Sequence, residues 1–320
     1  MTSDHLTFRG NNAIVVKHWI GRWNTVLVRA YVSVLSERSV ALKCRICEAE
    51  ARLWADRGDV ALFRCGRRSF VSGEPRETLA AADRYRGYFA APSPPAPEAR
   101  YRQWLAEAEA IVGRGRLLEV GAGMGGLVRV AVSRGWKVDA TEVSERGLAA
   151  LRETGVAVFA GDLTAADYGE AQFDLVVSVE VLEHVPAPLV HLREMWRVTR
   201  PGGLLILTTP NFHGLSRRWL GVRWRVIDPE HLGYFTSTTL SRLLREVGYT
   251  SVRVTSRTLD VLSWRRGPGP AGVTPFDPHA SARLRDAVEG SRILRLGKSA
   301  LNRVLRVSGL GDSLLVWARR

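Results

Sequence analysis

The chain has 320 residues, of which 46% are hydrophobic and 24% charged, and its formal net charge is +14. This apolar share and a mean hydropathy of -0.07 exclude disordered and collagen-like proteins, and no apolar run reaches the ~20 residues that a bilayer requires. The first 34 residues lack the organisation of a secretory signal, and three cysteines are too few for a disulfide framework. We therefore expect a cytoplasmic protein.

The basic excess is concentrated at the carboxyl end, where residues 261–320 contain 11 basic and 4 acidic side chains. Such a segment can attract nucleic acid or an anionic membrane surface. It contains no basic module with interleaved aromatic residues of a known RNA-binding kind. A solvated basic surface is therefore favoured over a nucleic-acid site. Peripheral membrane contact stays open, and the sequence does not indicate an oligomeric state.

Two proline-rich stretches divide the chain. Residues 90–99 and 265–278 cannot form a helix or a central strand, because their prolines lack backbone donors and bias the preceding residues toward extended geometry. We expect an N-terminal extension over 1–40, a ribbon-like segment with a linker over 41–98 and a core domain over 99–260. The remaining residues, 261–320, are predicted to form a basic helical segment and a final strand.

Short β-branched runs alternate with helical patterns inside the core. The predicted strands cover 116–120, 137–141, 156–160, 173–178, 204–208 and 251–256, and the predicted helices cover 127–133, 144–153, 187–198 and 236–247. Ser144 is a candidate N-cap, and Pro201-Gly202-Gly203 is expected to separate a helix from the strand after it. This order predicts an α/β fold with a doubly wound, mostly parallel sheet, which binds ligands at the carboxyl ends of its strands.

A glycine-rich turn follows the first predicted strand of the core. The sequence from Glu119 to Gly126, EVGAGMGG, fits both the dinucleotide pattern G-x-G-x-x-G and the E-x-G-x-G-x-G pattern of S-adenosylmethionine enzymes. Glu142 ends the second strand, where a carboxylate can accept hydrogen bonds from ribose hydroxyls. Asp162 and Leu163 end the third strand and could meet an adenine. The negative charge of Glu119 disfavours a diphosphate and favours a cationic ligand.

With these residues in place, the stretch from Leu117 to Tyr249 resembles the class I S-adenosylmethionine-dependent methyltransferases, in the broad group with bacterial small-molecule and quinone enzymes. The matching pieces are LLEVGAGMGGLVRVA (117–131), VDATEVS (138–144), GDL (161–163), FDLVVSVEVLEHVPAP (173–188), LREMWRVTRPGGLLILTTPN (192–211) and DPEHLGYFTSTTLSRLLREVGY (228–249). The resemblance implies a Rossmann-like methyltransferase fold with N-terminal and C-terminal additions. The cofactor residues that it implies are Glu119, Gly121, Ala122, Gly123, Gly125, Glu142, Val143, Asp162, Leu163, Ser178 and Glu180.

The resemblance further implies direct in-line transfer of a methyl group from the sulfonium of S-adenosylmethionine to a small-molecule acceptor. A secondary metabolite, a sugar, a quinone or a lipid precursor would fit, and the acceptor atom is left open. Two alternatives remain. The chain could be a non-catalytic binding or assembly module that retains the fold, or a nicotinamide-dinucleotide enzyme.

Two Glu-His dipeptides are candidates for acid–base work. Glu183-His184 follows the fourth strand of the core, and Glu230-His231 lies in a segment expected to cover the acceptor pocket. A hydroxyl acceptor would benefit from a base with a pKa near neutrality, which histidine supplies. His184 and His231 are therefore the catalytic candidates. The alternative is that each only orders its loop through a hydrogen bond.

Three cysteines precede the core. Cys44 and Cys47 form a C-x2-C pair, and Cys65 is followed by Arg68 where a second pair would place its cysteine. Structural zinc requires four ligands. We expect a degenerate zinc ribbon without metal, with a zinc site at the three cysteines as the weaker alternative.

The last segments complete the predicted architecture. Residues 211–228 are basic and aromatic and follow the fifth strand, so they are expected to form a lid over the acceptor. Residues 283–306 have helical spacing, and residues 312–319 are expected to form a last antiparallel strand.

Overall fold

The computed structural model describes residues 41–76, 98–259 and 292–320. The N-terminal extension, most of the first linker and the second linker therefore lie outside the described residues, as does the start of the predicted 283–306 helix. Ala41–Arg320 form a single compact unit. Among the described helices, none is both long and apolar enough to cross a membrane.

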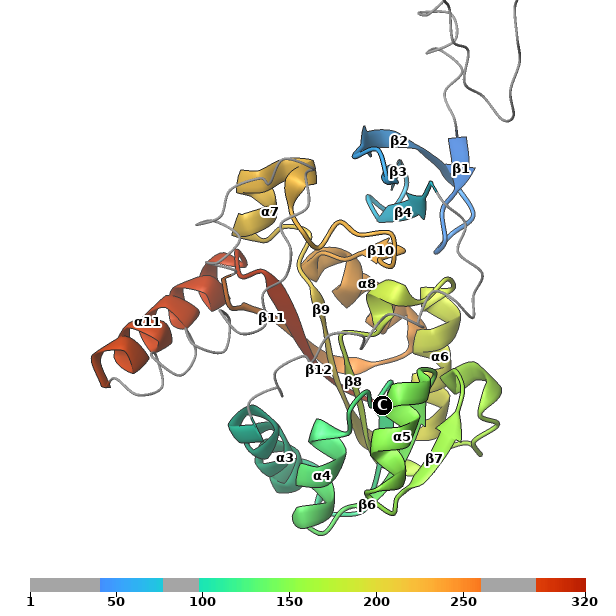
Figure 1. Ribbon diagram of the computed structural model, residues 1–320, viewed down its shortest axis with the longest axis vertical. Coiled ribbons are helices and arrows are strands. Elements are labelled where there is room, and N and C mark those ends of the chain that lie inside the picture. The colour runs from blue at the N-terminus through green and yellow to red at the C-terminus, as the bar shows by residue number, and fades with distance from the viewer. Residues whose placement is uncertain (1–40, 77–97, 260–291) are drawn as a thin grey trace, which may run out of the picture. The chain divides into compact units, whose positions relative to one another are not determined.

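The centre of the fold is a seven-stranded sheet in the order β11-β12-β9-β8-β5-β6-β7 (Figure 1). Its strands are β5 (Arg116–Val120), β6 (Lys137–Glu142), β7 (Ala157–Ala160), β8 (Phe173–Val179), β9 (Thr199–Pro210), β11 (Thr250–Arg257) and β12 (Ser313–Arg319). The five strands from β5 to β9 are parallel, and β12 runs antiparallel to both β9 and β11. The predicted doubly wound, mostly parallel sheet with a final antiparallel strand is confirmed.

Helices cover both faces of this sheet. They are α3 (Glu98–Val112), α4 (Gly126–Ser133), α5 (Glu145–Arg152), α6 (Pro188–Val198) and α8 (Ser237–Val247). Side chains of a strand alternate between its faces, so Leu117 packs with α3, α4 and α5, whereas Leu118 packs with α6 and α8. Such a sheet leaves only its strand ends free for a ligand.

A second sheet is antiparallel and has the order β1-β2-β3-β4-β10. Its strands are β1 (Ala41–Lys43), β2 (Glu50–Asp56), β3 (Val60–Cys65), β4 (Val71–Pro75) and β10 (Gly233–Tyr234). The first four come from the predicted ribbon-like segment, whereas β10 comes from the segment that follows β9. Pairing of Gly233 with Ser72 and of Tyr234 with Val71 joins the two.

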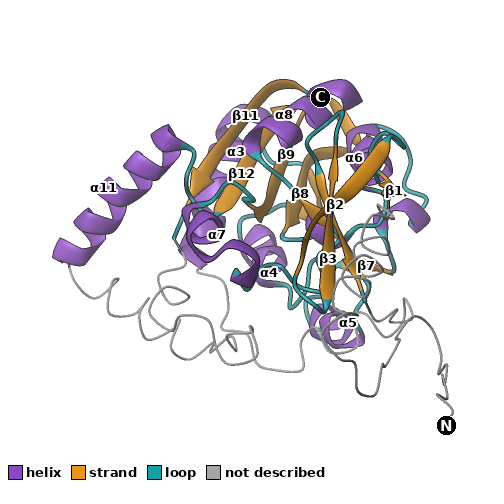
Figure 2. Ribbon diagram, turned by 90° about the horizontal axis from the view of Figure 1, so that it is seen from above, coloured by secondary structure: helices purple, strands orange, loops and turns teal. Residues whose placement is uncertain are grey.

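Three further elements, two short ones and one long helix, lie in the chain between strands of the two sheets. The short helix α7 (Leu215–Leu220) and the 3-10 turn η3 (Gly221–Arg223) lie in the predicted lid segment. The helix α11 (Arg292–Ser308) falls in the predicted C-terminal helical region and extends away from the central sheet in both views (Figures 1 and 2).

Side chains cap the first turns of two helices that the sequence predicts. Ser144 caps α5 and accepts a hydrogen bond from the Gly147 N–H, and Thr236 forms a capping box with Thr239 at α8. The prediction for Pro201-Gly202-Gly203 is wrong. These residues lie inside β9, which begins at Thr199 directly after α6, and the strand accommodates them through a register shift against β8 and a positive φ of 77° at Gly202.

Candidate functional site

A cavity of about 410 Å³ opens at the carboxyl ends of β5, β6, β7 and β8. The predicted cofactor residues that line it are Glu119, Gly121, Ala122, Gly123, Glu142, Val143, Asp162, Leu163 and Glu180. His184 also lines it. The residues of four separate predicted motifs therefore meet at one cavity, as expected for a parallel sheet.

The glycine loop between β5 and α4 requires glycine at its two turning points. Gly121 and Gly123 have φ values of 69° and 53°, in the left-handed region that side chains disfavour. A Cβ on Gly121 would also lie 2.6 Å from Cγ2 of Val181. Gly125, with a φ of 72°, is the N-cap of α4 and does not line the cavity. Its role is to start the helix.

Glu142 is locked at the end of β6 by backbone donors. Its Oε2 accepts the Gly123 N–H at 2.6 Å, and its Oε1 accepts the N–H groups of Val143 at 3.0 Å and Ser144 at 2.7 Å. These bonds tie the carboxylate to the glycine loop and to the start of α5. The carboxylate is therefore held in a fixed place on the cavity wall, available to accept further hydrogen bonds.

Glu119 is almost completely buried, with 3% of its surface exposed, yet it lines the cavity. Its Oε2 has no hydrogen-bond partner among the described residues. Burial, with the neighbouring Glu142 carboxylate, raises the pKa of Glu119 to about 8, although a hydrogen bond from the backbone N–H of Val128 opposes this rise. A cationic group in the cavity would relieve this cost.

Asp162 and Leu163 lie at the end of β7. The Oδ1 of Asp162 accepts hydrogen bonds from the N–H of Thr164 at 2.8 Å and from its hydroxyl at 2.6 Å. These bonds fix the carboxylate at the start of the 3-10 turn η1 (Leu163–Ala165). Leu163 is fully buried and offers an apolar wall.

The sequence predictions missed several residues of the cavity wall, among them His191 and Tyr101. His191 on α6 is 1% exposed, neither of its ring nitrogens has a hydrogen-bond partner among the described residues, and its Nδ1 lies 3.7 Å from Oδ2 of Asp162. Burial lowers the pKa of His191. Tyr101 comes from α3, which precedes β5, the first strand of the central sheet in the chain. In the sequence Tyr101 belongs to a set of apolar residues at helical spacing, with Trp104, Leu105 and Ala108. Such spacing predicts the buried face of a helix and does not indicate a binding site.

Of the two predicted cofactor residues at the end of β8, Ser178 and Glu180, only Glu180 lines the cavity. Ser178 is fully buried and is not part of the cavity wall. Glu180 lines the cavity with a φ of 55°, and burial raises the pKa of its carboxyl. The neighbours of Ser178 that reach the cavity are Val179 and Val181.

The two predicted catalytic histidines meet although 46 residues separate them in the chain. The rings of His184 and His231 have centroids 4.6 Å apart. His184 belongs to the 3-10 turn η2 (Leu182–His184) and lines the cavity, whereas His231 stands behind it and is not part of the wall. Burial lowers the pKa of His231. Of the two predicted catalytic histidines, only His184 therefore reaches the cavity wall.

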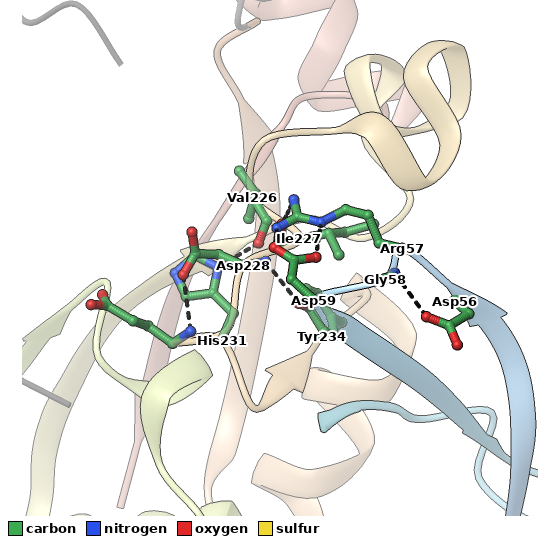
Figure 3. A network of polar contacts seen from close by, with 10 residues as sticks. Asp56, Arg57, Gly58, Asp59, Val226, Ile227, Asp228, His231 and Tyr234 are labelled. Carbon is green, nitrogen blue, oxygen red and sulfur yellow. Dashed lines mark hydrogen bonds and ion pairs between the residues drawn. The ribbon is translucent and has the colours of Figure 1, made fainter. Parts of the chain in front are cut away.

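Figure 3 shows how the His231 loop is held by the second sheet. Arg57, between β2 and β3, pairs with Asp59 and donates a hydrogen bond to the carbonyl of Ile227. The hydroxyl of Tyr234 accepts the N–H of Asp228 at 3.3 Å. The ribbon-like segment thus positions a residue of the candidate site.

The three cysteines also come together. Their sulfur atoms lie within 4.8 Å of one another, and burial raises the pKa of Cys44 to about 12. The backbone N–H of Arg68 donates to Cys65 Sγ at 3.4 Å, while the Arg68 guanidinium pairs with Glu246 at 2.5 Å. The part of the chain that the structure describes supplies no fourth histidine, cysteine or carboxylate ligand to this cluster.

We expect this thiol cluster to hold no zinc, because the position of a fourth ligand is taken by a cation. Cys47 is the half-buried member of the cluster, so we use the variant Cys47→Ser. Wild-type protein and this variant should contain the same amount of zinc per chain after dialysis, as measured by elemental analysis. One zinc per chain in the wild type that is lost in Cys47→Ser would contradict this.

Comparisons with known proteins identify the family of the chain. The model of the methyltransferase domain family matches residues 95–254. The ubiquinone biosynthesis O-methyltransferase of Pseudomonas aeruginosa strain LESB58 is 36% identical over 115 residues, which cover 34% of this chain and 49% of that protein. The chain thus spans about half the length of the curated relatives that it matches.

Solved structures of methyltransferases also match. An S-adenosylmethionine-dependent methyltransferase from Archaeoglobus fulgidus is 16% identical with a TM-score of 0.48, over 70% of this chain and 92% of that one. Another from Mesorhizobium loti is 20% identical with a TM-score of 0.44, over 68% of this chain and 98% of that one. Since the family model covers half of the chain, from α3 to β11, the chain belongs to the methyltransferase domain family, in the class I S-adenosylmethionine-dependent group.

Proposed function

We propose that the protein transfers a methyl group from S-adenosylmethionine to an oxygen atom of a small-molecule acceptor. The observation that carries the proposal is the pair of buried carboxyl groups at the glycine loop. Glu142 is fixed by three backbone donors, and Glu119 presents an unpartnered oxygen at the cavity. The first suits the hydroxyls of a ribose, and the second suits a cationic amine.

The residues present fit this cofactor. In the proposal Glu119 and the glycine loop hold the methionine part, Glu142 holds the ribose, and Asp162 with Leu163 meets the adenine. His191, neutral and unpartnered beside Asp162, adds a hydrogen-bonding group on the adenine side. Bound S-adenosylmethionine supplies a methyl group on an already activated sulfur, so the chain's own contribution is chiefly binding and alignment.

A dinucleotide enzyme is the less favourable alternative. The pyrophosphate of a dinucleotide would approach the glycine loop beside Glu119. Burial already makes the ionised form of this carboxyl group unfavourable, and a neighbouring diphosphate would add electrostatic repulsion to that cost. A non-catalytic binding module is also less favourable, because nine of the eleven predicted cofactor residues line the cavity.

An oxygen acceptor is favoured by two observations. The relative from Pseudomonas aeruginosa is named as an O-methyltransferase of ubiquinone biosynthesis. In this chain a histidine with a backbone-anchored ring, His184, lines the same cavity. A hydroxyl benefits from a neighbouring group that removes or stabilises its proton. We propose a hydroxyl-bearing small molecule and neither a nucleic acid nor a protein.

The first prediction from this proposal concerns Glu142. Glu142→Ala should weaken binding of both S-adenosylmethionine and S-adenosylhomocysteine by about 10- to 150-fold, which corresponds to the ~1.5–3 kcal/mol of a charge-assisted hydrogen-bonding site. Calorimetry measures it, with Glu145→Ala, an exposed acid on α5, as the matched control. Wild-type protein that binds NADH but neither of these ligands would contradict the proposed function.

The second prediction concerns Glu119. With a pKa of about 8 the carboxyl is mostly protonated at pH 7 in the free protein. A bound ammonium favours the ionised form, so binding of S-adenosylhomocysteine should release a proton. The affinity should therefore rise with pH between 6 and 8, by up to about tenfold per unit.

Calorimetry in two buffers of different ionisation enthalpy measures that proton directly. Glu119→Gln should abolish the release and flatten the pH profile. A proton release that persists in Glu119→Gln would assign it to another group and overturn the role of Glu119.

A further inference from the structure

Three arginine residues from three separate elements lie around the end of β11. Arg100 belongs to the first turn of α3, Arg257 is the last residue of β11, and Arg306 belongs to the last turn of α11. We call these three residues the arginine cluster. They are far apart in the sequence, so only the fold brings their charges together.

The end of β11 lies at the same edge of the central sheet as the cofactor cavity. β12 lies between β9 and β11 and runs antiparallel to both, so β11 points in the same direction as the parallel strands (Figure 1). Strands that share a direction place their carboxyl ends at the edge where such sheets bind ligands. Arg257 therefore belongs to the ligand-binding edge, although it does not line the cavity itself.

The face of the sheet that carries Arg257 is the one covered by α3. Arg257 is paired with Ser313, the first residue of β12, and directly paired residues share a face. Leu315 and Trp317 follow Ser313 at alternate positions on that face, and both pack in the same core cluster as the side chains of α3. The Arg257 side chain thus lies on the side of the sheet from which α3 supplies Arg100.

Two contacts connect this face to the wall of the cavity. The Ser313 hydroxyl donates a hydrogen bond to the carboxyl group of Glu180, which lines the cavity. Burial raises the pKa of Glu180, and the charge of Arg100 counteracts part of that rise, so Arg100 lies close to the same wall. Tyr101, the next residue of α3, also lines the cavity. The arginine cluster therefore adjoins the cavity beside Glu180 and Tyr101.

The charges of the arginine cluster are not neutralised. Nε of Arg257 is buried and has no hydrogen-bond partner in the described part of the chain. Burial, with the positive charges of Arg306 and Arg100, lowers the pKa of Arg257 to about 10. The carboxylate of Glu107 opposes this change without forming an ion pair with Arg257. An anion bound among the three guanidinium groups would offset both the burial and the repulsion.

We propose that the arginine cluster binds a carboxylate or phosphate group of the methyl acceptor, so that the acceptor is an anion. This inference deepens the proposed function and rests on it. Guanidinium groups are planar, always charged donors whose geometry matches these oxyanions. An acceptor held by its anionic end would have fewer orientations beside the cavity, which favours alignment of its hydroxyl with the methyl group.

Calorimetry with three small probes tests the site. Phenyl phosphate, benzoate and benzyl alcohol all contain one benzene ring, but only the first two are anions at pH 7. Each is titrated into the full-length protein saturated with S-adenosylhomocysteine. We expect one equivalent of an anionic probe to bind, and the tighter of the two identifies the preferred group. Benzyl alcohol should bind at least ~10-fold more weakly.

Two variants locate the bound anion. Arg257→Gln and Arg100→Gln should each weaken binding of the anionic probe at least ~10-fold, because each removes a charged hydrogen-bond donor. Arg102→Gln is the matched control, since it removes the same charge from an exposed side chain of α3 outside the cluster. This control should bind the probe like the wild type. All three variants should keep their affinity for S-adenosylhomocysteine, which also shows that they are folded.

No saturable binding of either anion, equally tight binding of benzyl alcohol, or unchanged anion affinity in both cluster variants would each overturn the anion site. Weaker S-adenosylhomocysteine binding by cluster variants of unchanged thermal stability would assign the arginines to the carboxylate of the cofactor, which also overturns it. These results leave methyl transfer itself untouched. Failure of the wild type to bind S-adenosylhomocysteine would overturn the proposed function, and titration of the unloaded protein would then still test the anion site.

Discussion

Two hydrogen bonds join the loop before β10 to the turn after β8. The N–H of Leu232 donates to the carbonyl of Glu183 at 2.7 Å, and Nδ1 of His184 meets the carbonyl of Glu230 at 3.1 Å. On its other side the loop is held by β4, which pairs with β10, and by Arg57. Because the loop is fixed from both sides, His231 stays against His184. The position of His231 beside the cavity residue His184 therefore depends on the small antiparallel sheet.

The cofactor side depends on a different constraint. Parallel strands end at the same edge, so the residues that follow β5, β6, β7 and β8 line one cavity regardless of their separation in sequence. There the backbone N–H groups of Gly123, Val143 and Ser144 fix Glu142, whereas Glu119 stays buried without a full set of partners. One carboxylate is held by three hydrogen bonds, and the other is buried with an oxygen that has no partner among the described residues.

Features that depend on residues close together in sequence could be predicted, whereas features that depend on distant segments could not. The glycine loop, the Ser144 cap and the strands of the core depend on neighbours a few residues away, and these were predicted closely. The pairing of β10 with β4 joins segments about 160 residues apart, and no local pattern indicates it. Tyr101 and His191 are missed because helix burial alone does not reveal a cavity. Within β9, tertiary pairing overrides the breaking tendency of Pro201-Gly202-Gly203.

Methyl transfer to a small molecule can be followed with an isotope-labelled cofactor. The purified protein is incubated with S-adenosylmethionine carrying a deuterated methyl group and with a lysate of the host organism, and the products are analysed by mass spectrometry. We expect the labelled methyl group on a small molecule, with one S-adenosylhomocysteine formed for each methyl transferred. Bound cofactor without any transfer, or label found only in protein or nucleic acid, would contradict it.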